Sequence, residues 1–300
     1  MALIEIQSVQ GSLRLNFEDV GQGNPLVFIH GWPLSLDMWE YQVNDLVSRG
    51  FRCIAYDRRG FGKSDKPGSG YDFDTLSHDL HGFLKAMNLR NVTLIGFSMG
   101  GGEVTRYLSL FGSDRVTSAV LISSVTPILV QTPSNPGGVP YEKFDEIRDG
   151  LKKDRPAFLA SFGKQFYGQS WITKPVSTDV LDWTRGLALQ ASPIATLECV
   201  RSFSETDFHA DLGRIDVPTL VIHGDADQTV PFETTGKVSA SLIRRASLSE
   251  YKGAPHGLFY TDKERLNEEI SSFANTHSKN PSKNQSNVDE IDSPGFMANL

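Results

Sequence analysis

The chain has 300 residues, of which 39% are hydrophobic and 22% charged, a composition typical of a soluble globular protein. Its formal net charge of −7 disfavours nucleic acid and anionic membranes as partners. Residues 1–10 lack the pattern of a secretory signal, and no apolar stretch approaches the roughly 20 residues that span a bilayer. The two cysteines show neither a disulfide framework nor metal-ligand spacing. We therefore expect a cytoplasmic, metal-free protein with no nucleic-acid or membrane partner.

Short apolar runs and helical patterns alternate along the chain. Residues 3–9 and 13–20 alternate at period two and predict an opening hairpin. Five nearly continuous apolar runs then predict strands buried on both faces of a parallel sheet, at 25–31, 51–57, 91–97, 116–123 and 217–224. Helical patterns occur at about 38–49, 73–88, 98–111, 232–244 and 262–275. This alternation predicts the α/β class, with a doubly wound, mostly parallel sheet and flanking helices.

One long segment interrupts the alternation. Residues 125–210 contain helical and aromatic patterns but no convincing strand, so we interpret them as a helical lid over one end of the sheet. Residues 1–124 and 211–275 would then form the core. The last residues, 276–300, are polar, punctuated by proline and aperiodic, which predicts a disordered tail.

The stretch GFSMGGG, residues 96–102, follows the predicted strand at 91–97 and opens a predicted helix. Its first five residues form the pattern G-x-S-x-G, in which a serine occupies a sharp strand-to-helix turn and is exposed for nucleophilic attack. The glycines after Ser98 are poor helix formers. We infer that they are there to let the strand and the helix approach closely. Ser98 is therefore the candidate nucleophile.

A serine nucleophile needs a general base and an acid that orients the base. After a serine at such a turn, these partners follow in the chain order acid and then histidine. His256 lies in the loop GAPHGLF, after the last strand-like segment, where the base is expected. The loop after the strand at 217–224 offers Asp225 and Asp227 as the acid. We expect Asp225 to bond nearby backbone N–H groups and favour Asp227 as the acid.

An oxyanion needs two backbone donors aimed at the developing negative charge. One is expected from Met99, the residue after the nucleophile, and the other from Trp32 in the loop HGWPLS. Pro33 has no N–H to donate, and it restricts Trp32 to extended conformations.

No dinucleotide-binding pattern follows a strand, and GFGKS at 60–64 lacks the first glycine of a phosphate-binding loop. We therefore expect no nucleotide cofactor.

Several segments resemble the cofactor-free bacterial haloperoxidase, perhydrolase and arylesterase group of α/β-hydrolases. They are HGWPLSLDMWEYQ, YDRRGFGKSDKP, GFSMGGGEVTRY, IDVPTLVIHGDADQTVPFETTGK and APHGL, within residues 5–275. The resemblance implies an α/β-hydrolase fold with a triad of Ser98, Asp227 and His256, and with Trp32 and Met99 as oxyanion donors. It also implies hydrolysis of small esters through an acyl-serine. Members of the group form peracids from hydrogen peroxide and short carboxylic acids, without haem or another metal.

The substrate pocket is expected to be a dry space under the lid. We place six residues in it: Pro33, next to Trp32; Phe162 and Phe166, by helical spacing; and Val125, Val230 and Phe232, by topology. Several aromatic side chains together favour small acyl groups or aryl leaving groups. The expected partners are a small ester or carboxylic acid, with water or hydrogen peroxide as the second reactant. A homo-oligomer is an open expectation, since such relatives often assemble.

Other activities fit part of the same pattern. Haloalkane dehalogenases and epoxide hydrolases carry an aspartate where this chain has Ser98, so they are disfavoured. Hydrolysis of γ-lactams or other small cyclic amides and lactones stays open as the alternative reaction. A ligand receptor on a retained hydrolase fold would keep the same three side chains. It would show slow single turnover rather than catalysis, and no feature of the segment at 125–210 favours it.

Overall fold

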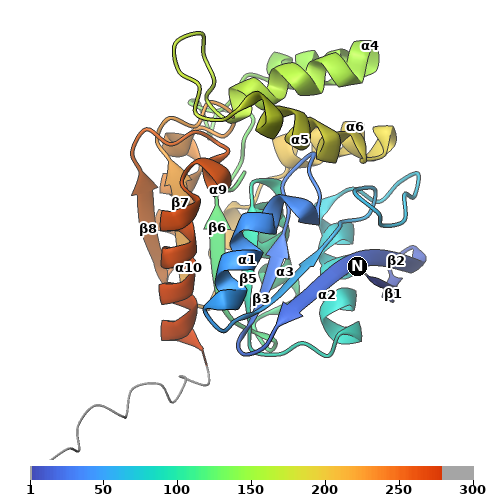
Figure 1. The fold of residues 1–300 in the computed structure, drawn as a ribbon, viewed down its shortest axis with the longest axis vertical. Helices are drawn as coiled ribbons and strands as arrows, with labels where there is room; N and C mark the ends of the chain where they lie inside the picture. Colours follow the sequence, from blue (N-terminus) through green and yellow to red (C-terminus); the bar gives the residue numbers. More distant parts are fainter. Residues whose placement is uncertain (1, 279–300) are drawn as a thin grey trace, which may run out of the picture.

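In the computed structural model, which describes residues 2–278, eight strands form one central sheet (Figure 1). In chain order the strands are β1 (Ala2–Ser8), β2 (Gly11–Gly21), β3 (Pro25–Ile29), β4 (Arg52–Tyr56), β5 (Val92–Phe97), β6 (Val116–Ile122), β7 (Thr219–Gly224) and β8 (Ala246–Tyr251). Their order in space is β1-β2-β4-β3-β5-β6-β7-β8. Among these strands, the pairings of β2 with β1 and with β4 are antiparallel, and the other pairings are parallel. The predicted α/β class and its mostly parallel sheet are confirmed.

The helices follow the strands in the predicted alternation. They are η1 (Leu36–Trp39), α1 (Glu40–Ser48), α2 (Phe73–Ala86), α3 (Met99–Phe111), α4 (Tyr141–Phe166), α5 (Thr178–Leu189), α6 (Pro193–Glu205), α7 (His209–Leu212), η2 (Phe232–Thr234), α8 (Gly236–Leu242), α9 (Leu258–Thr261) and α10 (Lys263–His277). Helices α1 and α10 pack together in front of the sheet in Figure 1, and α2 and α3 pack together behind it. Strands β5 and β7 are buried along their whole length, as continuous apolar runs between two helical layers require.

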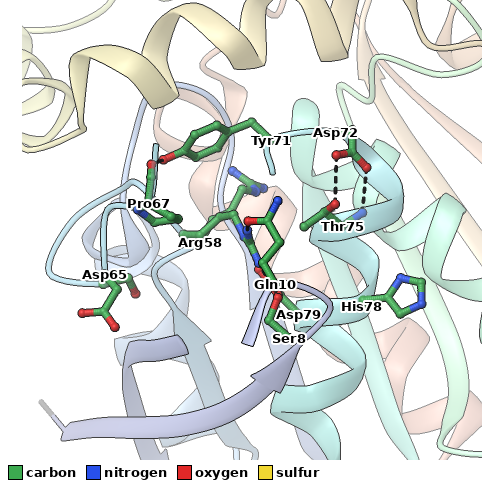
Figure 2. Close-up of polar contacts among 12 residues, drawn as sticks. Ser8, Gln10, Arg58, Asp65, Pro67, Tyr71, Asp72, Thr75, His78 and Asp79 are labelled. Atoms are coloured by element: carbon green, nitrogen blue, oxygen red, sulfur yellow. Dashed lines mark hydrogen bonds and ion pairs between the residues drawn. The ribbon is translucent and has the colours of Figure 1, made fainter. Parts of the chain in front are cut away.

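Helix α2 shows how side chains define an element's start. The Asp72 carboxylate accepts hydrogen bonds from the N–H of Thr75 at 2.8 Å and from its hydroxyl at 2.9 Å (Figure 2). Such a cap satisfies one of the free N–H groups at a helix start.

Further along α2, Asp79 forms a buried ion pair with Arg59 at 2.5 Å. Arg59 also donates to Ser8 at 2.6 Å, so the pair joins α2 to the hairpin of β1 and β2.

The helices α4, α5 and α6, between β6 and β7, lie above one end of the sheet (Figure 1). Helix α4 is broken at Asp154, whose φ of −157° and ψ of 86° are not helical. The Asp154 carboxylate accepts from the N–H of Ala157 at 3.0 Å, so it caps the second half of the helix. Pro156 is tolerated there because it stands in a first turn, where its missing N–H costs no hydrogen bond.

Two of the predicted boundaries differ from the structure. The pattern at 232–244 predicted one helix, but Thr235 adopts non-helical dihedral angles and separates η2 from α8. The predicted tail began at residue 276, whereas α10 continues to His277, and residues 279–300 lie outside the described residues. The division into a core at 1–124 and 211–275 and a lid at 125–210 stays a prediction.

Candidate active site

Ser98 stands at the sharp turn between β5 and α3, with a φ of 54° and a ψ of −118°. Such a backbone conformation is rare for a residue with a side chain and costs on the order of 1–3 kcal/mol. Two hydrogen bonds hold the turn: the Ser98 N–H donates to Ile122 at 2.8 Å, and the N–H of Gly101 donates to the Ser98 carbonyl at 3.0 Å. The surrounding fold therefore maintains a strained serine at the end of the sheet.

The glycines behind Ser98 are required by close packing. A Cβ atom on Gly100 would lie 2.3 Å from the carbonyl oxygen of Ile29 in β3, and one on Gly101 would lie 2.4 Å from the hydroxyl of Ser124. Neither distance is possible for real atoms, so larger residues would push α3 away from the sheet. A Cβ atom on Gly102 would lie 2.8 Å from the ring of Phe73, so close packing accounts for all three glycines in a helix that they weaken.

The structure brings together the three side chains that the sequence placed in a triad. His256 Nε2 lies 3.0 Å from Ser98 Oγ, and His256 Nδ1 lies 2.6 Å from Asp227 Oδ2. All three residues are buried, with 6%, 7% and 1% exposure for Ser98, Asp227 and His256. Both distances are within the reach that proton transfer and orientation need. The arrangement can therefore take a proton from the serine hydroxyl and stabilise the imidazolium that results.

The choice between the two aspartates follows from their partners. Asp227 Oδ1 accepts hydrogen bonds from the N–H groups of Thr229 and Val230, both at 2.8 Å, while Oδ2 faces His256. Asp225 instead accepts from the N–H of Gly253 at 2.6 Å. Burial alone would raise the pKa of Asp227, but the charge and hydrogen bonds of the adjacent histidines outweigh it and lower that pKa below its usual value. Asp227 is therefore held as a carboxylate.

The two expected oxyanion donors are the N–H groups of Met99 and Trp32. Met99 is the first residue of α3, so its N–H has no acceptor within the helix. The Trp32 N–H belongs to the same peptide unit as the Gly31 carbonyl. That carbonyl accepts from His30 Nδ1 at 2.9 Å and from the N–H of Leu34 at 3.0 Å. Because the C=O and N–H of a trans peptide point in opposite directions, these bonds also fix the direction of the Trp32 N–H.

His30 is itself fixed in one protonation state. The backbone N–H of Arg58 donates to His30 Nε2 at 3.0 Å, so the ring proton is on Nδ1, where it can reach Gly31. Burial, together with the charge of Arg58, lowers the pKa of His30 well below its usual value. Arg58 is buried as well and is paired with Glu103 at 2.6 Å. The loop that carries Trp32 is thus anchored by a buried polar network.

A cavity of about 620 Å³ opens beside Ser98 and His256, under α4 and α6. Its volume lies in the range typical of small-molecule sites. Its apolar walls are Trp32, Val125, Leu129, Val139, Phe144, Ile147, Phe158, Phe162, Phe203 and Val230. Its polar lining comes from Lys143, Glu146, Ser161, Gln165, Gln228 and Thr229, besides the serine and the histidine.

Of the six predicted pocket residues, Val125, Phe162 and Val230 line this cavity. Pro33 and Phe166 do not, and lie instead around a hollow of about 10 Å³ that is too small for a substrate. Residues four apart on a helix are offset by about 40°, which turns Phe166 away from the cavity that Phe162 faces.

The ring contacts of Phe166 and Phe232 show what these two side chains do instead. The Phe166 ring packs edge-on against His256, with 5.0 Å between the ring centroids, so it borders the triad rather than the cavity. Phe232, also predicted for the pocket, packs instead against His223, with 5.7 Å between the rings. Phe158, four residues before Phe162 on α4, lines the cavity and was missed, because a spacing of four does not tell on which side of Phe162 the cavity lies.

Among residues 2–278, no cluster of three or more histidine, cysteine, aspartate or glutamate side chains could hold a metal ion. Both cysteines, Cys53 and Cys199, are buried and unpaired. Within the same part of the chain, no helix has the length and apolar character needed to cross a bilayer.

A mostly parallel sheet with a serine at a strand-to-helix turn, followed by an acid and a histidine on later loops, defines the α/β-hydrolase class. The sequence model of the family described as "alpha/beta hydrolase fold" matches residues 24–263, so the chain belongs to this family. The resemblance that the motifs indicated is confirmed at this level.

Three individual proteins are similar to this chain over most of its length. The chain is 44% identical to a non-heme chloroperoxidase from Streptomyces lividans, over 84% of this chain and 91% of the relative. It is 39% identical to a bifunctional esterase/perhydrolase from Acinetobacter calcoaceticus, over 83% of this chain and 91% of the relative. Among solved structures it is similar to a bromoperoxidase from Bacillus anthracis, with 44% identity, a TM-score of 0.87, and coverage of 91% of this chain and 99% of the other.

Proposed function

We propose that the protein is a serine hydrolase that cleaves small carboxylic esters through an acyl-serine intermediate. The hydrogen-bonded series Ser98, His256 and Asp227, open to an apolar cavity, carries the proposal. His256 takes the hydroxyl proton as Ser98 Oγ attacks the ester carbonyl. The N–H groups of Trp32 and Met99 stabilise the oxyanion that forms. The same imidazolium then donates its proton to the departing alcohol, which leaves the acyl group on Ser98.

The second half of the reaction regenerates the serine. A water molecule gives its proton to His256 and attacks the acyl carbonyl, which releases the carboxylic acid as the proton returns to Ser98 Oγ. Hydrogen peroxide attacking in place of water forms a peracid by the same proton transfers. No change in oxidation state occurs at the enzyme, and the peracid then oxidises halide in solution. The names of the relatives, esterase/perhydrolase and non-heme chloroperoxidase, support both outcomes.

The cavity supports esters with an aromatic leaving group. Its volume of about 620 Å³ is larger than a short acyl group needs, and the rings of Phe144, Phe158, Phe162 and Phe203 face it. Aromatic walls favour aromatic ligands through offset and edge-on contacts. We therefore assign the substrate class as small aryl esters, in which the acyl group lies near Ser98 and the aryl group contacts the rings.

The test is hydrolysis of p-nitrophenyl esters with acyl chains of two to eight carbons, with and without hydrogen peroxide. We expect turnover that is highest for short chains, and bromide oxidation when peroxide and a short carboxylic acid are supplied together. Ser98→Ala is the control for both reactions. Turnover that survives in Ser98→Ala, or activity on γ-lactams without any on esters, would contradict the proposal. A cytoplasmic location and a homo-oligomeric state stay predictions from the sequence.

A further inference from the structure

A second buried histidine contacts the acid of the proposed triad. His223 is the last residue but one of β7 and has no exposed surface. Its Nε2 lies 2.9 Å from the carbonyl oxygen of Val230 and 3.3 Å from Asp227 Oδ2. A carbonyl oxygen can only accept a hydrogen bond, so Nε2 carries the ring proton and donates it. The proposed mechanism uses no proton of this ring.

The opposite side of the ring is closed. His223 Nδ1 is buried and has no hydrogen-bond partner among the described residues. A Cβ atom on Gly236 would lie 2.4 Å from this nitrogen, which shows how closely the start of α8 packs against it. The Phe232 ring covers another side. The surroundings therefore hold the imidazole in one orientation, with Nε2 towards the acid.

The contacts of His223 join two parts of the site. Val230 donates its N–H to Asp227 Oδ1 at 2.8 Å, while its carbonyl accepts the proton of His223. The bond from Val230 to Asp227 closes the turn 227–230, and the bond from His223 to Val230 attaches this turn to the end of β7. Val230 also lines the cavity. A shift of the His223 ring would therefore move both the acid and one wall of the cavity.

We propose that His223 is a positioning residue, whose Nε2–H fixes the turn 227–230 and shares Asp227 Oδ2 with His256. This inference rests on the proposed function of the same site. A carboxylate oxygen that accepts two N–H groups offers each of them less negative charge than it would offer to one alone. His223 thereby limits how strongly Asp227 stabilises the protonated form of His256. It adjusts the base without contacting the substrate.

Few other groups can produce such an effect. The ionisable side chains that face the Asp227 carboxylate are His223 and His256. The neighbours of His256 are the hydroxyl of Ser98 and the rings of Phe97 and Phe166, none of which carries a charge near neutral pH. A change in the pH profile of the reaction after substitution of His223 is therefore traced to Asp227.

The experiment compares His223→Phe with His223→Gln. Phenylalanine fills the space of the ring but has no donor, whereas the glutamine amide can place an N–H near the position of Nε2. In His223→Phe, we expect the acid limb of the kcat/KM profile for p-nitrophenyl acetate to move to higher pH by roughly half a unit to one unit. We also expect kcat to fall by about tenfold, because the turn 227–230 that carries the acid loses its attachment to β7. His223→Gln should restore most of both values.

Each outcome bears on the inference. The inference is overturned if the two variants share one pH profile, or if the profile of His223→Phe matches that of the unaltered protein. Absence of ester hydrolysis in the unaltered protein would instead overturn the proposed function. If His223→Phe does not fold, nitrogen-15 NMR of the unaltered protein gives the answer. We expect the proton on His223 Nε2, with scalar coupling to the Val230 carbonyl, and a proton found on Nδ1 would contradict the role.

Discussion

The reaction centre at the end of the sheet and the cavity beneath α4 and α6 are held by different forces. Directional hydrogen bonds fix the reaction centre, from His256 Nδ1 to Asp227 at 2.6 Å and from the N–H of Val230 to the same carboxylate at 2.8 Å. The cavity is formed mainly by apolar and aromatic side chains, whose contacts depend on area and shape rather than on direction.

This difference predicts two kinds of response to substitution. A polar group that acts in the transition state contributes orders of magnitude to the rate, and no neighbour can replace it. A side chain in an apolar wall contributes in proportion to its area, so its loss changes affinity and selectivity by modest factors. The variants described next test this contrast, beginning with the largest expected effect.

Ser98→Ala should lower kcat for p-nitrophenyl acetate by about 10⁴- to 10⁶-fold, because the attacking oxygen is removed. Steady-state kinetics measures the loss, and circular dichroism should show an unchanged fold. A decrease of less than tenfold would mean that the reaction centre lies elsewhere. The comparison between this centre and the cavity would then be wrong.

Asp227→Asn should lower kcat by on the order of 10³- to 10⁴-fold, because an amide can hold the imidazole in the wrong tautomer and cannot stabilise the imidazolium. Asp225→Asn is the matched control, since Asp225 bonds to Gly253 rather than to His256. Equal losses in the two variants would contradict the assignment of the acid.

Phe162→Ala should raise KM for aryl esters by roughly fivefold and change kcat little, because an aromatic contact worth about 1 kcal/mol is lost. Phe273→Ala removes a ring of the same size on α10 that does not line the cavity, and should leave KM within a factor of about two. A loss of kcat in Phe162→Ala as large as that in Asp227→Asn would contradict the proposed difference between the reaction centre and the cavity.

The smallest effect concerns stability. Ser98→Gly should increase the free energy of unfolding by about 1–2 kcal/mol relative to Ser98→Ala, because glycine adopts a φ of 54° without the strain of a side chain. Urea denaturation of the two inactive variants measures the difference. Equal stabilities would show that the turn stores no strain at this position.

The sequence was most informative where chemistry restricts the choice of residue. The pattern at 96–100 predicted Ser98 as the nucleophile, and the position of His256 after the last strand predicted it as the base, because few residue types can do either task. Phe166 and Phe232 show the opposite case. Both are aromatic residues near the predicted pocket, yet one packs on His256 and the other on His223. Apolar side chains serve the core and a pocket equally well, so their type does not reveal which they line.

The sequence by itself determined the order of strands and helices and the three candidate reactive side chains. Periodicity and motif spacing are local properties of the chain, so they can be read without coordinates. Only the tertiary structure decided which apolar residues enclose the cavity and that His223 contacts the acid turn. Those features depend on the directions of side chains from distant segments, such as β7 and α8 around His223, and the packing of the whole chain sets these directions.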